Sequence, residues 1–292
     1  MKPPTLTADI LSRLHHVKVR GEGADLSCFP DFLIVGPQRT GTTWLYHNLK
    51  CHPQIFLPRD KETFYFKALV KKEAERKRYD SLDDYLAIMR DSPGRWIKKS
   101  YDALRRCGER YRPEMRGEAT ASYATLPGAV IADIAALNPD IKAIVMLRDP
   151  VERALSHAKK DLVRDAGKNP SELSVEDYQK FFRAKGQRNL AKYGEIISRW
   201  EPHLAAGNLM LGEFRQIAEA PEALLGQIHR FLGVREGAKY LHPRLLRQRI
   251  NPAGESPVPE DALAFLRELL AEEVEDFRRV VNALPGAGIA HS

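Results

Sequence analysis

Gly36 and Gly41 enclose four residues within FLIVGPQRTGTTWLYHNL, residues 32–49. This is the glycine spacing of a phosphate-cradling loop, in which successive backbone N–H groups and a helix N-terminus point at one anion. The polar side chains nearby are a cation and three hydroxyls: Arg39, Thr40, Thr42 and Thr43. A nucleoside-triphosphate loop requires lysine directly after the second glycine, where this chain has Thr42. The segment therefore predicts a site for a phosphate-like group that is poorly built for ATP; a plain turn would not need these polar groups.

A second anion site is predicted within MLRDPVERALSHAKKD, residues 146–161. Arg148 follows an apolar stretch directly, and Ser156 lies about two helical turns further on. Arginine offers a planar fork of donors to a phosphate, and serine adds a hydroxyl. The alternative is that Asp149 caps a helix while Arg148 and Arg153 form surface ion pairs. The residues alone leave both interpretations open.

A third candidate is Glu62 in PRDKETFYF, residues 58–66. It lies next to Lys61 and just before an aromatic cluster, so its carboxylate could serve as a general base. An ordinary glutamate at the start of a helix would give the same pattern, and this alternative also stays open. The other candidates for a base are three histidines: His47, His52 and His157.

The elements that must position these residues follow from the hydrophobic pattern. Apolar runs predict strands at 32–35, 55–57, 117–121, 141–147 and 208–212. Helical periodicity predicts helices directly after residue 41, at 81–90, 99–110 and 129–137, from 151 onward, and at 174–183, 188–205, 222–232 and 260–283, with a loop at 242–259. Strands alternate with helices, which predicts an α/β fold with one domain and a central, mostly parallel sheet flanked by helices. Ligands of such sheets bind at the carboxyl ends of the strands, where the loop at 36–41 and Arg148 both fall.

Composition narrows the class of protein further. The chain has 292 residues and a formal net charge of +7, which suits anionic ligands. Nucleic-acid binding would rest only on that charge and on the basic run at 71–78, so we do not expect it. No apolar run approaches the ~20 residues of a membrane span, and residues 1–23 lack the apolar core of a signal peptide. The three cysteines have no metal-ligand spacing, which favours a reduced, cytoplasmic setting.

Together the three segments resemble the sulfotransferases that use 3′-phosphoadenosine 5′-phosphosulfate (PAPS). The resemblance is to the branch of Golgi heparan-sulfate sulfotransferases and their bacterial relatives, and it extends from about residue 31 to 284. GPQRTGTTWL is similar to the 5′-phosphosulfate loop of that family, and LRDPVERALSH to its 3′-phosphate motif. KETFYF resembles the acidic and aromatic segment that supplies the base. The implied division is an N-terminal extension at 1–30, a sulfotransferase domain at 31–285 and a tail at 286–292.

The resemblance also implies roles for individual residues. Arg39 would neutralise charge on the oxygen that leaves sulfur, and Glu62 would take the acceptor proton. The residues implied to bind the donor are Arg39, Thr40, Gly41, Thr42, Thr43, Trp44, Arg148, Ser156, Arg247 and Arg249. We expect Trp44 to pack at the base of the loop in preference to stacking on adenine, while Arg247 and Arg249 either close over the 3′-phosphate or stay solvated. The residues implied to contact the acceptor are aromatic: Phe64, Tyr65 and Tyr123.

The resemblance makes a carbohydrate hydroxyl the expected acceptor and adenosine 3′,5′-bisphosphate the expected product, with no metal. Three departures from the heparan-type pattern concern the acceptor. Phe64 occupies a position where those enzymes have histidine, Ala119 replaces a lysine after Glu118, and no cysteine follows Cys107. Sulfation of a lipid or phenol by the same chemistry is therefore an alternative, as are a P-loop kinase and a non-catalytic nucleotide-binding protein. The oligomeric state is not readable from the chain.

Overall fold

A five-stranded sheet, entirely parallel, forms the centre of the protein, with the strand order β2-β3-β1-β4-β5. The strands are β1 Phe32–Gly36, β2 Ile55–Phe56, β3 Met115–Ala119, β4 Lys142–Leu147 and β5 Leu209–Glu213. The computed structural model describes residues 2–70, 79, 81–167, 169, 172–248, 250 and 257–284. Arg249, the basic run at 71–78 and the predicted tail lie outside these residues. The predicted α/β fold with a central parallel sheet is confirmed.

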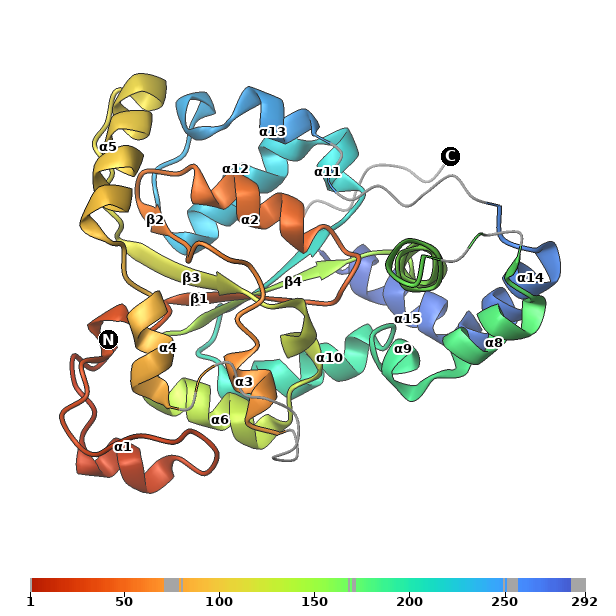
Figure 1. Ribbon diagram of the computed structural model, residues 1–292, viewed down its shortest axis with the longest axis horizontal. Helices are drawn as coiled ribbons and strands as arrows, with labels where there is room; N and C mark the ends of the chain where they lie inside the picture. Colours follow the sequence, from red (N-terminus) through yellow and green to blue (C-terminus); the bar gives the residue numbers. More distant parts are fainter. Residues whose placement is uncertain are drawn as a thin grey trace.

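Helices cover both faces of the sheet because its central strands are apolar on both sides. In Figure 1, α2 (Thr42–Lys50) and α12 (Pro221–Leu232) lie above the sheet, while α6 (Gly128–Leu137) and α10 (Tyr193–Trp200) lie below it. Every residue of β1 is buried. Two hydrophobic clusters form the core, one on each face, and a third links α7, α8 and α14 beside the sheet.

The remaining α-helices in the described residues are α1 Ala8–Arg13, α3 Tyr65–Ala68, α4 Leu82–Ile88, α5 Pro93–Cys107, α7 Pro150–Ala158, α8 Val175–Arg183, α9 Lys185–Asn189, α11 Gln216–Glu219, α13 Pro243–Arg247, α14 Glu260–Leu269 and α15 Ala271–Asn282. Short 3-10 turns occur at Leu26–Cys28, Ala121–Thr125, Glu201–His203 and Ala238–Tyr240, and α7 continues into a π-helical stretch at Lys159–Asp165. None of the described helices has the length and apolar character needed to cross a bilayer.

Several predicted boundaries are wrong. The helix predicted at 188–205 is divided, since α9 ends at Asn189 and α10 begins at Tyr193. The helix predicted at 260–283 breaks at Leu270, whose side chain is buried in the third cluster. Helix α5 begins six residues earlier than predicted, at Pro93, because proline is pre-organised for a first helical turn. The predicted loop at 242–259 contains α13, and the nitrogen Nδ1 of His242 accepts a 3.4 Å hydrogen bond from the amide of Leu245 in its first turn.

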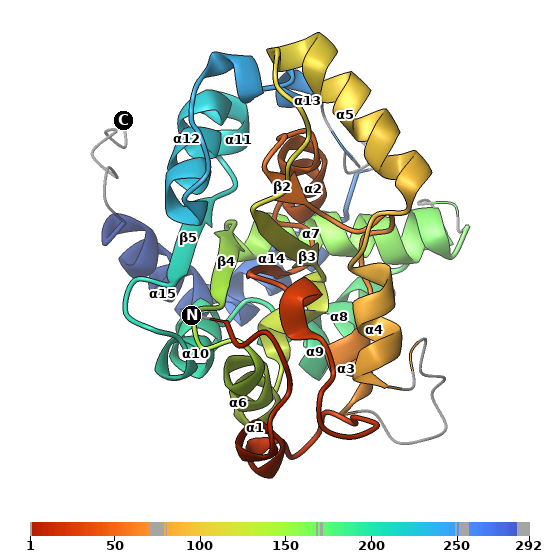
Figure 2. The same ribbon diagram turned by 90° about the vertical axis from the view of Figure 1, so that its left-hand side faces the viewer.

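The first thirty residues pack against the body of the protein. Leu6, Ile10 and Leu26 belong to the same buried cluster as β1. The carboxylate of Asp133 on α6 accepts hydrogen bonds from the backbone amides of residues 15, 16 and 17, at 3.0, 2.7 and 2.9 Å. Figure 2 shows this segment on the same side of the molecule as α4 and α5, with α5 running past the β2 edge of the sheet.

Candidate active site

The loop between β1 and α2 has a shape that only glycine permits at its two ends. Gly36 has φ +109°, and a Cβ atom there would lie 2.0 Å from the carbonyl oxygen of Ala121. Gly41 has φ +86°, and a Cβ atom there would lie 2.3 Å from Cδ1 of Ile217. Gly41 caps α2 without any side-chain hydrogen bond. The first N–H groups of α2 are therefore available to an anion, together with the positive end of the helix dipole.

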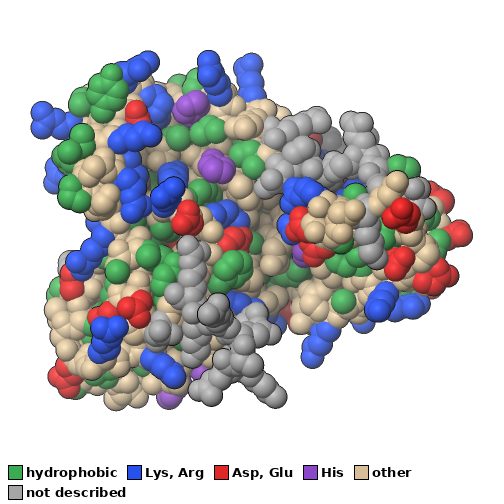
Figure 3. All heavy atoms as spheres, viewed as in Figure 1, with side chains coloured by type: hydrophobic (Ala, Val, Ile, Leu, Met, Phe, Trp, Pro, Cys, Tyr) green, Lys and Arg blue, Asp and Glu red, His purple; other side chains and the backbone are tan. Residues whose placement is uncertain are grey.

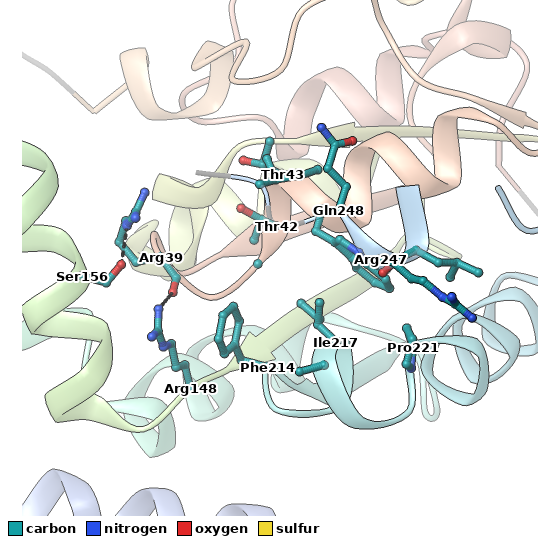
Figure 4. Close-up of a pocket in the computed structure, with 15 residues that line it drawn as sticks. Arg39, Thr42, Thr43, Arg148, Ser156, Phe214, Ile217, Pro221, Arg247 and Gln248 are labelled. Carbon is teal, nitrogen blue, oxygen red and sulfur yellow. Dashed lines mark hydrogen bonds between the residues drawn. The ribbon is translucent and has the colours of Figure 1, made fainter. Parts of the chain in front are cut away.

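A cavity of about 610 Å³ opens at the start of α2 (Figure 4). Its volume is in the range of pockets that hold a nucleotide-sized ligand. Eight residues from the predicted donor site line it: Arg39, Gly41, Thr42, Thr43, Trp44, Arg148, Ser156 and Arg247. They come from the loop, α2, the end of β4, α7 and α13, so segments more than 200 residues apart in the chain meet here.

Two arginines and a serine form one cluster at an end of this cavity (Figure 4). The Nε–H of Arg39 donates to the hydroxyl of Ser156 at 2.9 Å. The Nη1 group of Arg148 donates to the carbonyl oxygen of Arg39 at 3.2 Å, and its guanidinium lies 4.2 Å from the ring centroid of Phe214. Burial is the main cause that lowers the pKa of Arg39, followed by repulsion from Arg164 and Arg148. Concentrated, partly desolvated positive charge of this kind attracts an anion.

The structure shows which parts of the capping and ion-pair interpretation of the segment at 146–161 are correct. The Asp149 carboxylate caps α7, since it accepts from the amide of Glu152 at 2.9 Å, and Arg148 pairs with exposed Glu152 at 3.3 Å. Arg153, however, forms no surface ion pair with any described residue. Its side chain is fully buried and donates to the carbonyl oxygen of Gln187 at 3.2 Å. The alternative interpretation is therefore confirmed for the cap at Asp149 and the ion pair of Arg148 and is wrong for Arg153, while the anion site stays a prediction.

Trp44 and Thr40 are buried at the base of the loop. The indole N–H of Trp44 donates to the carbonyl oxygen of Leu246 at 3.2 Å, while the residue also lines the cavity. The hydroxyl of Thr40 donates to the carbonyl oxygen of Pro37 at 2.7 Å. Thr40 does not line the cavity, so its hydroxyl stabilises the loop instead of facing a ligand. This corrects the expectation for the Thr40 side chain.

Part of the cavity wall was not predicted from the sequence. The additional lining residues are Phe214, Ile217, Ala218, Pro221, Leu246, Gln248 and Ile250. Phe214 directly follows β5, at the same carboxyl edge of the sheet as Arg148 after β4. That position after a strand was the signal that could have identified it.

Glu62 lies beside the loop, on a neighbouring segment with an unusual backbone. Glu62 and Phe64 both adopt left-handed conformations, with φ values of 67° and 59°. The Glu62 carboxylate accepts from the amide of Ala121 at 3.1 Å and pairs with Lys61. Because the carbonyl oxygen of Ala121 is the atom that would meet a Cβ at Gly36, the segment reaches the carboxyl edge of β1 and β3. Backbone strain of this kind gathers at functional sites.

The aromatic residues around Glu62 divide into two groups. Phe64 is 45% exposed and available for contact. Tyr65 and Tyr123 are 2% and 0% exposed, so the prediction that they contact an acceptor is wrong for this conformation. Tyr65 stacks on Tyr85, and the hydroxyl of Tyr123 accepts from the amide of Phe66 at 3.1 Å. Both tyrosines thus hold the strained segment in place.

The buried carboxylate of Glu118 stabilises the segment that carries Glu62. Glu118 on β3 accepts hydrogen bonds from the hydroxyls of Thr63, Tyr85 and Thr120. Its burial raises its pKa above the ordinary value for a glutamate. The network links β3 and α4 to the residue that follows Glu62.

The match to known families settles the class of the protein. A model of the sulfotransferase family matches residues 30–236. The chain belongs to the sulfotransferase family. This membership favours the sulfotransferase prediction over a P-loop kinase, in agreement with Thr42 at the position of the kinase lysine.

Three curated relatives illustrate the range of proteins to which this chain is similar. Carbohydrate sulfotransferase 15 of Mus musculus is 32% identical over 164 residues, 49% of this chain and 29% of the relative. Membrane-associated sulfotransferase kil1 of Dictyostelium discoideum is 30% identical over 131 residues, 45% of this chain and 23% of the relative. Heparan sulfate glucosamine 3-O-sulfotransferase 3B1 of Mus musculus is 24% identical over 220 residues, 73% of this chain and 48% of the relative. The chain spans less than half the length of each.

A solved structure shares the fold. The sulfotransferase from Alicyclobacillus acidocaldarius matches with a TM-score of 0.53 and 22% sequence identity, over 86% of this chain and 99% of that chain. Within the described residues of this chain, no group of three or more histidine, cysteine or acidic side chains is arranged to hold a metal ion.

The three histidines considered as alternative bases occupy different environments in this sulfotransferase. His52 is 1% exposed, and its Nε2 lies 2.9 Å from the carbonyl oxygen of Arg235. His157 lies between Arg153 and Asp161, and burial lowers its pKa to about 4. His47 is largely exposed. Partial burial of its ring is the main cause that lowers its pKa, and the nearby charges of Lys50 and Lys61 lower it further. None of the three histidines lines the cavity, and Glu62 does not line it either; Glu62 differs from them in its hydrogen bond with Ala121, the residue whose carbonyl oxygen faces Gly36.

Proposed function

We propose that this sulfotransferase transfers the sulfuryl group of PAPS to a carbohydrate hydroxyl. The observation that carries the proposal is the cluster of Arg39, Arg148 and Ser156 at the uncapped start of α2. A donor with phosphates on the 3′ and 5′ oxygens of its ribose needs two anion sites separated by one ribose. In this proposal the start of α2 supplies one and Arg148 with Ser156 the other, and these residues line one cavity.

The cavity fits the donor group by group. The amides at the start of α2, with the hydroxyls of Thr42 and Thr43, suit the 5′-phosphosulfate. Arg148 and Ser156 suit the 3′-phosphate, because a guanidinium and a hydroxyl donate to several of its oxygens. The apolar wall formed by Phe214 and its neighbours suits the purine. This division would let the protein select PAPS over ATP, which has no 3′-phosphate.

The transfer requires a base, an in-line path and a stabilised leaving group. The acceptor oxygen forms a bond to sulfur while the bond from sulfur to the bridging oxygen breaks. The acceptor proton passes to the Glu62 carboxylate, and Arg39 neutralises the charge that develops on the phosphate of the leaving adenosine 3′,5′-bisphosphate. Positioning and charge stabilisation contribute most of the rate enhancement, as in phosphoryl transfer.

The acceptor class rests on the names of the relatives, two of which are enzymes for carbohydrate and heparan sulfate. Phe64 argues for a somewhat different acceptor surface, since an exposed phenyl ring replaces the histidine expected from the heparan-type pattern. An aromatic ring packs against the apolar face of a sugar, and also against a lipid or phenol. Incubation with candidate acceptors distinguishes a carbohydrate acceptor from a lipid or phenol.

Calorimetric binding tests the donor assignment. We expect adenosine 3′,5′-bisphosphate to bind more tightly than adenosine 5′-monophosphate, and Arg148→Ala to remove most of that preference. Equal affinity for the two nucleotides would refute the 3′-phosphate site. Incubation with radiolabelled PAPS and panels of glycans, lipid alcohols and phenols then identifies the acceptor. Labelling of a lipid or phenol alone would retain the chemistry and reject the carbohydrate.

A further inference from the structure

Helix α5 presents an apolar stripe to solvent. Six large hydrophobic side chains are strongly exposed in the described part of the chain, and four of them lie on this one helix. These four are Trp96, Ile97, Tyr101 and Leu104, with exposures of 47, 63, 60 and 47%. Ile97, Tyr101 and Leu104 follow the spacing i, i+4, i+7, so they share one face of the helix. Ser100 and Ala103 are buried, and they attach an adjoining side of α5 to the protein.

Ile97, Tyr101 and Leu104 lie along one exposed face of the helix, and Trp96 is exposed on a neighbouring face. Figure 3 shows hydrophobic side chains gathered over α5 at the upper left, with Lys and Arg side chains around them. A helix face with this spacing is normally buried in a globular protein. Contiguous exposed apolar surface marks a site of interaction, whereas single exposed apolar residues do not.

Positive charge flanks the stripe. Arg95, Lys98 and Arg105 are exposed on α5, against one exposed acid, Asp102. Beyond these cations, a cavity of about 490 Å³ between α5 and the end of α2 continues the basic surface onto the body of the protein. Its charged lining residues are Lys50, Lys99, Asp102, Arg105 and Arg106. The surface beside the apolar stripe is thus complementary to a negatively charged partner.

We propose that α5 docks the protein on the surface of an anionic lipid bilayer. The helix would lie in the plane of the interface, with Ile97 and Leu104 inserted among acyl chains. Tryptophan and tyrosine, which this helix also exposes, favour the headgroup level, and flanking lysine and arginine bind anionic lipids. With its 15 residues, α5 is about 22 Å long, which suits an interfacial helix and is too short to span the bilayer.

The same features argue against two other partners for this surface, a polyanionic glycan and a second copy of the chain. A polyanionic glycan would pair with the cations but would leave Ile97 and Leu104 exposed to water. A second copy of the chain would bury the stripe but would bring Lys98 and Arg105 of both copies close together, at an electrostatic cost. An anionic bilayer satisfies the apolar stripe and the cations together.

Flotation of the full chain with lipid vesicles tests the proposal. We expect binding to vesicles of phosphatidylcholine mixed with phosphatidylglycerol, and little binding to phosphatidylcholine alone. Ile97→Ser with Leu104→Ser should abolish flotation. Lys98→Gln with Arg105→Gln should weaken it by at least ~10-fold, because each cation near such a surface contributes substantially to binding. Arg267→Gln with Arg278→Gln is the matched control, since both arginines are exposed on other helices and their loss should leave flotation unchanged.

Binding of adenosine 3′,5′-bisphosphate measures folding of each variant independently of the vesicles. Equal flotation of wild type and the α5 variants would overturn the proposal, as would loss of flotation in the control. Conversion of a dimer to a monomer by the serine substitutions, seen by light scattering, would assign the stripe to a second copy. Binding to soluble heparin that survives those substitutions, with no binding to vesicles, would assign the surface to a glycan.

Discussion

At the scale of single residues, the site depends on where a few cations and one carboxylate are held. Arg39 and Arg148 are 109 positions apart in the chain, yet one donates to the backbone of the other at 3.2 Å. Bringing two guanidiniums together costs free energy in the absence of an anion, because like charges repel. A bound bisphosphate nucleotide offsets that repulsion, so occupancy of the cavity should stabilise the protein.

Replacing Arg39 tests charge stabilisation directly. Arg39→Ala should lower the turnover number by about 10²–10³-fold, the usual loss when one donor to a developing anion is removed. Arg39→Lys keeps the positive charge but loses the planar set of N–H donors of the guanidinium, so it should retain an intermediate rate. Single-turnover transfer from labelled PAPS measures both. A turnover number near that of wild type in Arg39→Ala would contradict the proposed role.

Glu62 should matter for turnover and not for donor binding. Glu62→Gln removes the proton acceptor while keeping its shape, so nucleotide affinity should persist and the rate should fall by about 10²–10⁴-fold. Calorimetry and initial-rate assays separate these two quantities. Glu268→Gln is a matched control, because Glu268 is exposed on α14; it should change neither nucleotide affinity nor the rate. If Glu62→Gln turns over normally, another group takes the proton.

At the scale of elements, the start of α2 combines an unusual backbone with tight packing. Gly41 has φ +86°, and a Cβ atom there would lie 2.3 Å from Cδ1 of Ile217, so the end of that side chain would have to shift. The position of Ile217, which lines the cavity on α11, therefore depends on this glycine. A side chain at residue 41 would displace the cavity wall as well as strain the loop.

The comparison of Gly41→Ala with Gly207→Ala isolates this packing effect. Gly207 has a similar φ of +81°, but no atom of the described residues would lie within 4 Å of a Cβ added there, so its substitution should cost only the backbone penalty of about 1–2 kcal/mol. Gly41→Ala should lower the free energy of unfolding by more and should also weaken nucleotide binding. Chemical denaturation and calorimetry provide the two measurements. Equal losses of stability in both variants would show that packing against Ile217 is unimportant.

At the scale of the whole molecule, three buried histidines make stability depend on pH; the rings of His52 and His229 are in contact, with centroids 4.7 Å apart, and His157 lies elsewhere, on α7. Burial is the leading cause that lowers the pKa of His52 and His157 to about 4 and that of His229 to about 3. The unfolded chain binds these protons near the ordinary value of 6.5, so it takes up more protons than the folded protein between about pH 6.5 and 4. Stability is therefore full above this window and falls as the pH decreases through it.

The expected decrease in the free energy of unfolding at low pH is large enough to measure. Each histidine should contribute about 3 kcal/mol of destabilisation by the acid end of the window. Glu118 acts in the opposite direction, because its raised pKa lets the folded protein keep a proton that the unfolded chain releases. Denaturation at several pH values measures the net slope, and His229→Phe should make it shallower. A midpoint independent of pH between 7.5 and 5 would contradict this prediction.

The sequence by itself determined the elements and the chemistry of the loop. Strand β1 and, after Lys142, strand β4 are continuous apolar runs, as expected for strands buried on both faces of a parallel sheet, and this pattern is visible without coordinates. The spacing of Gly36 and Gly41 encodes local backbone geometry, so the strand-loop-helix unit was also predictable. Because parallel strands share one carboxyl edge, the meeting of Arg148 with this loop followed from the fold class.

Only the tertiary structure decided which side chains face a ligand. Tyr65 and Tyr123 have the composition of a binding surface but are buried, since Tyr65 stacks on Tyr85 of α4 and the hydroxyl of Tyr123 accepts from the amide of Phe66 on α3. Phe214 enters the cavity because β5 happens to lie next to β4 in the sheet. The outward direction of the stripe on α5 has the same origin. Periodicity gives the existence of an apolar face, whereas packing against distant segments decides whether that face is covered.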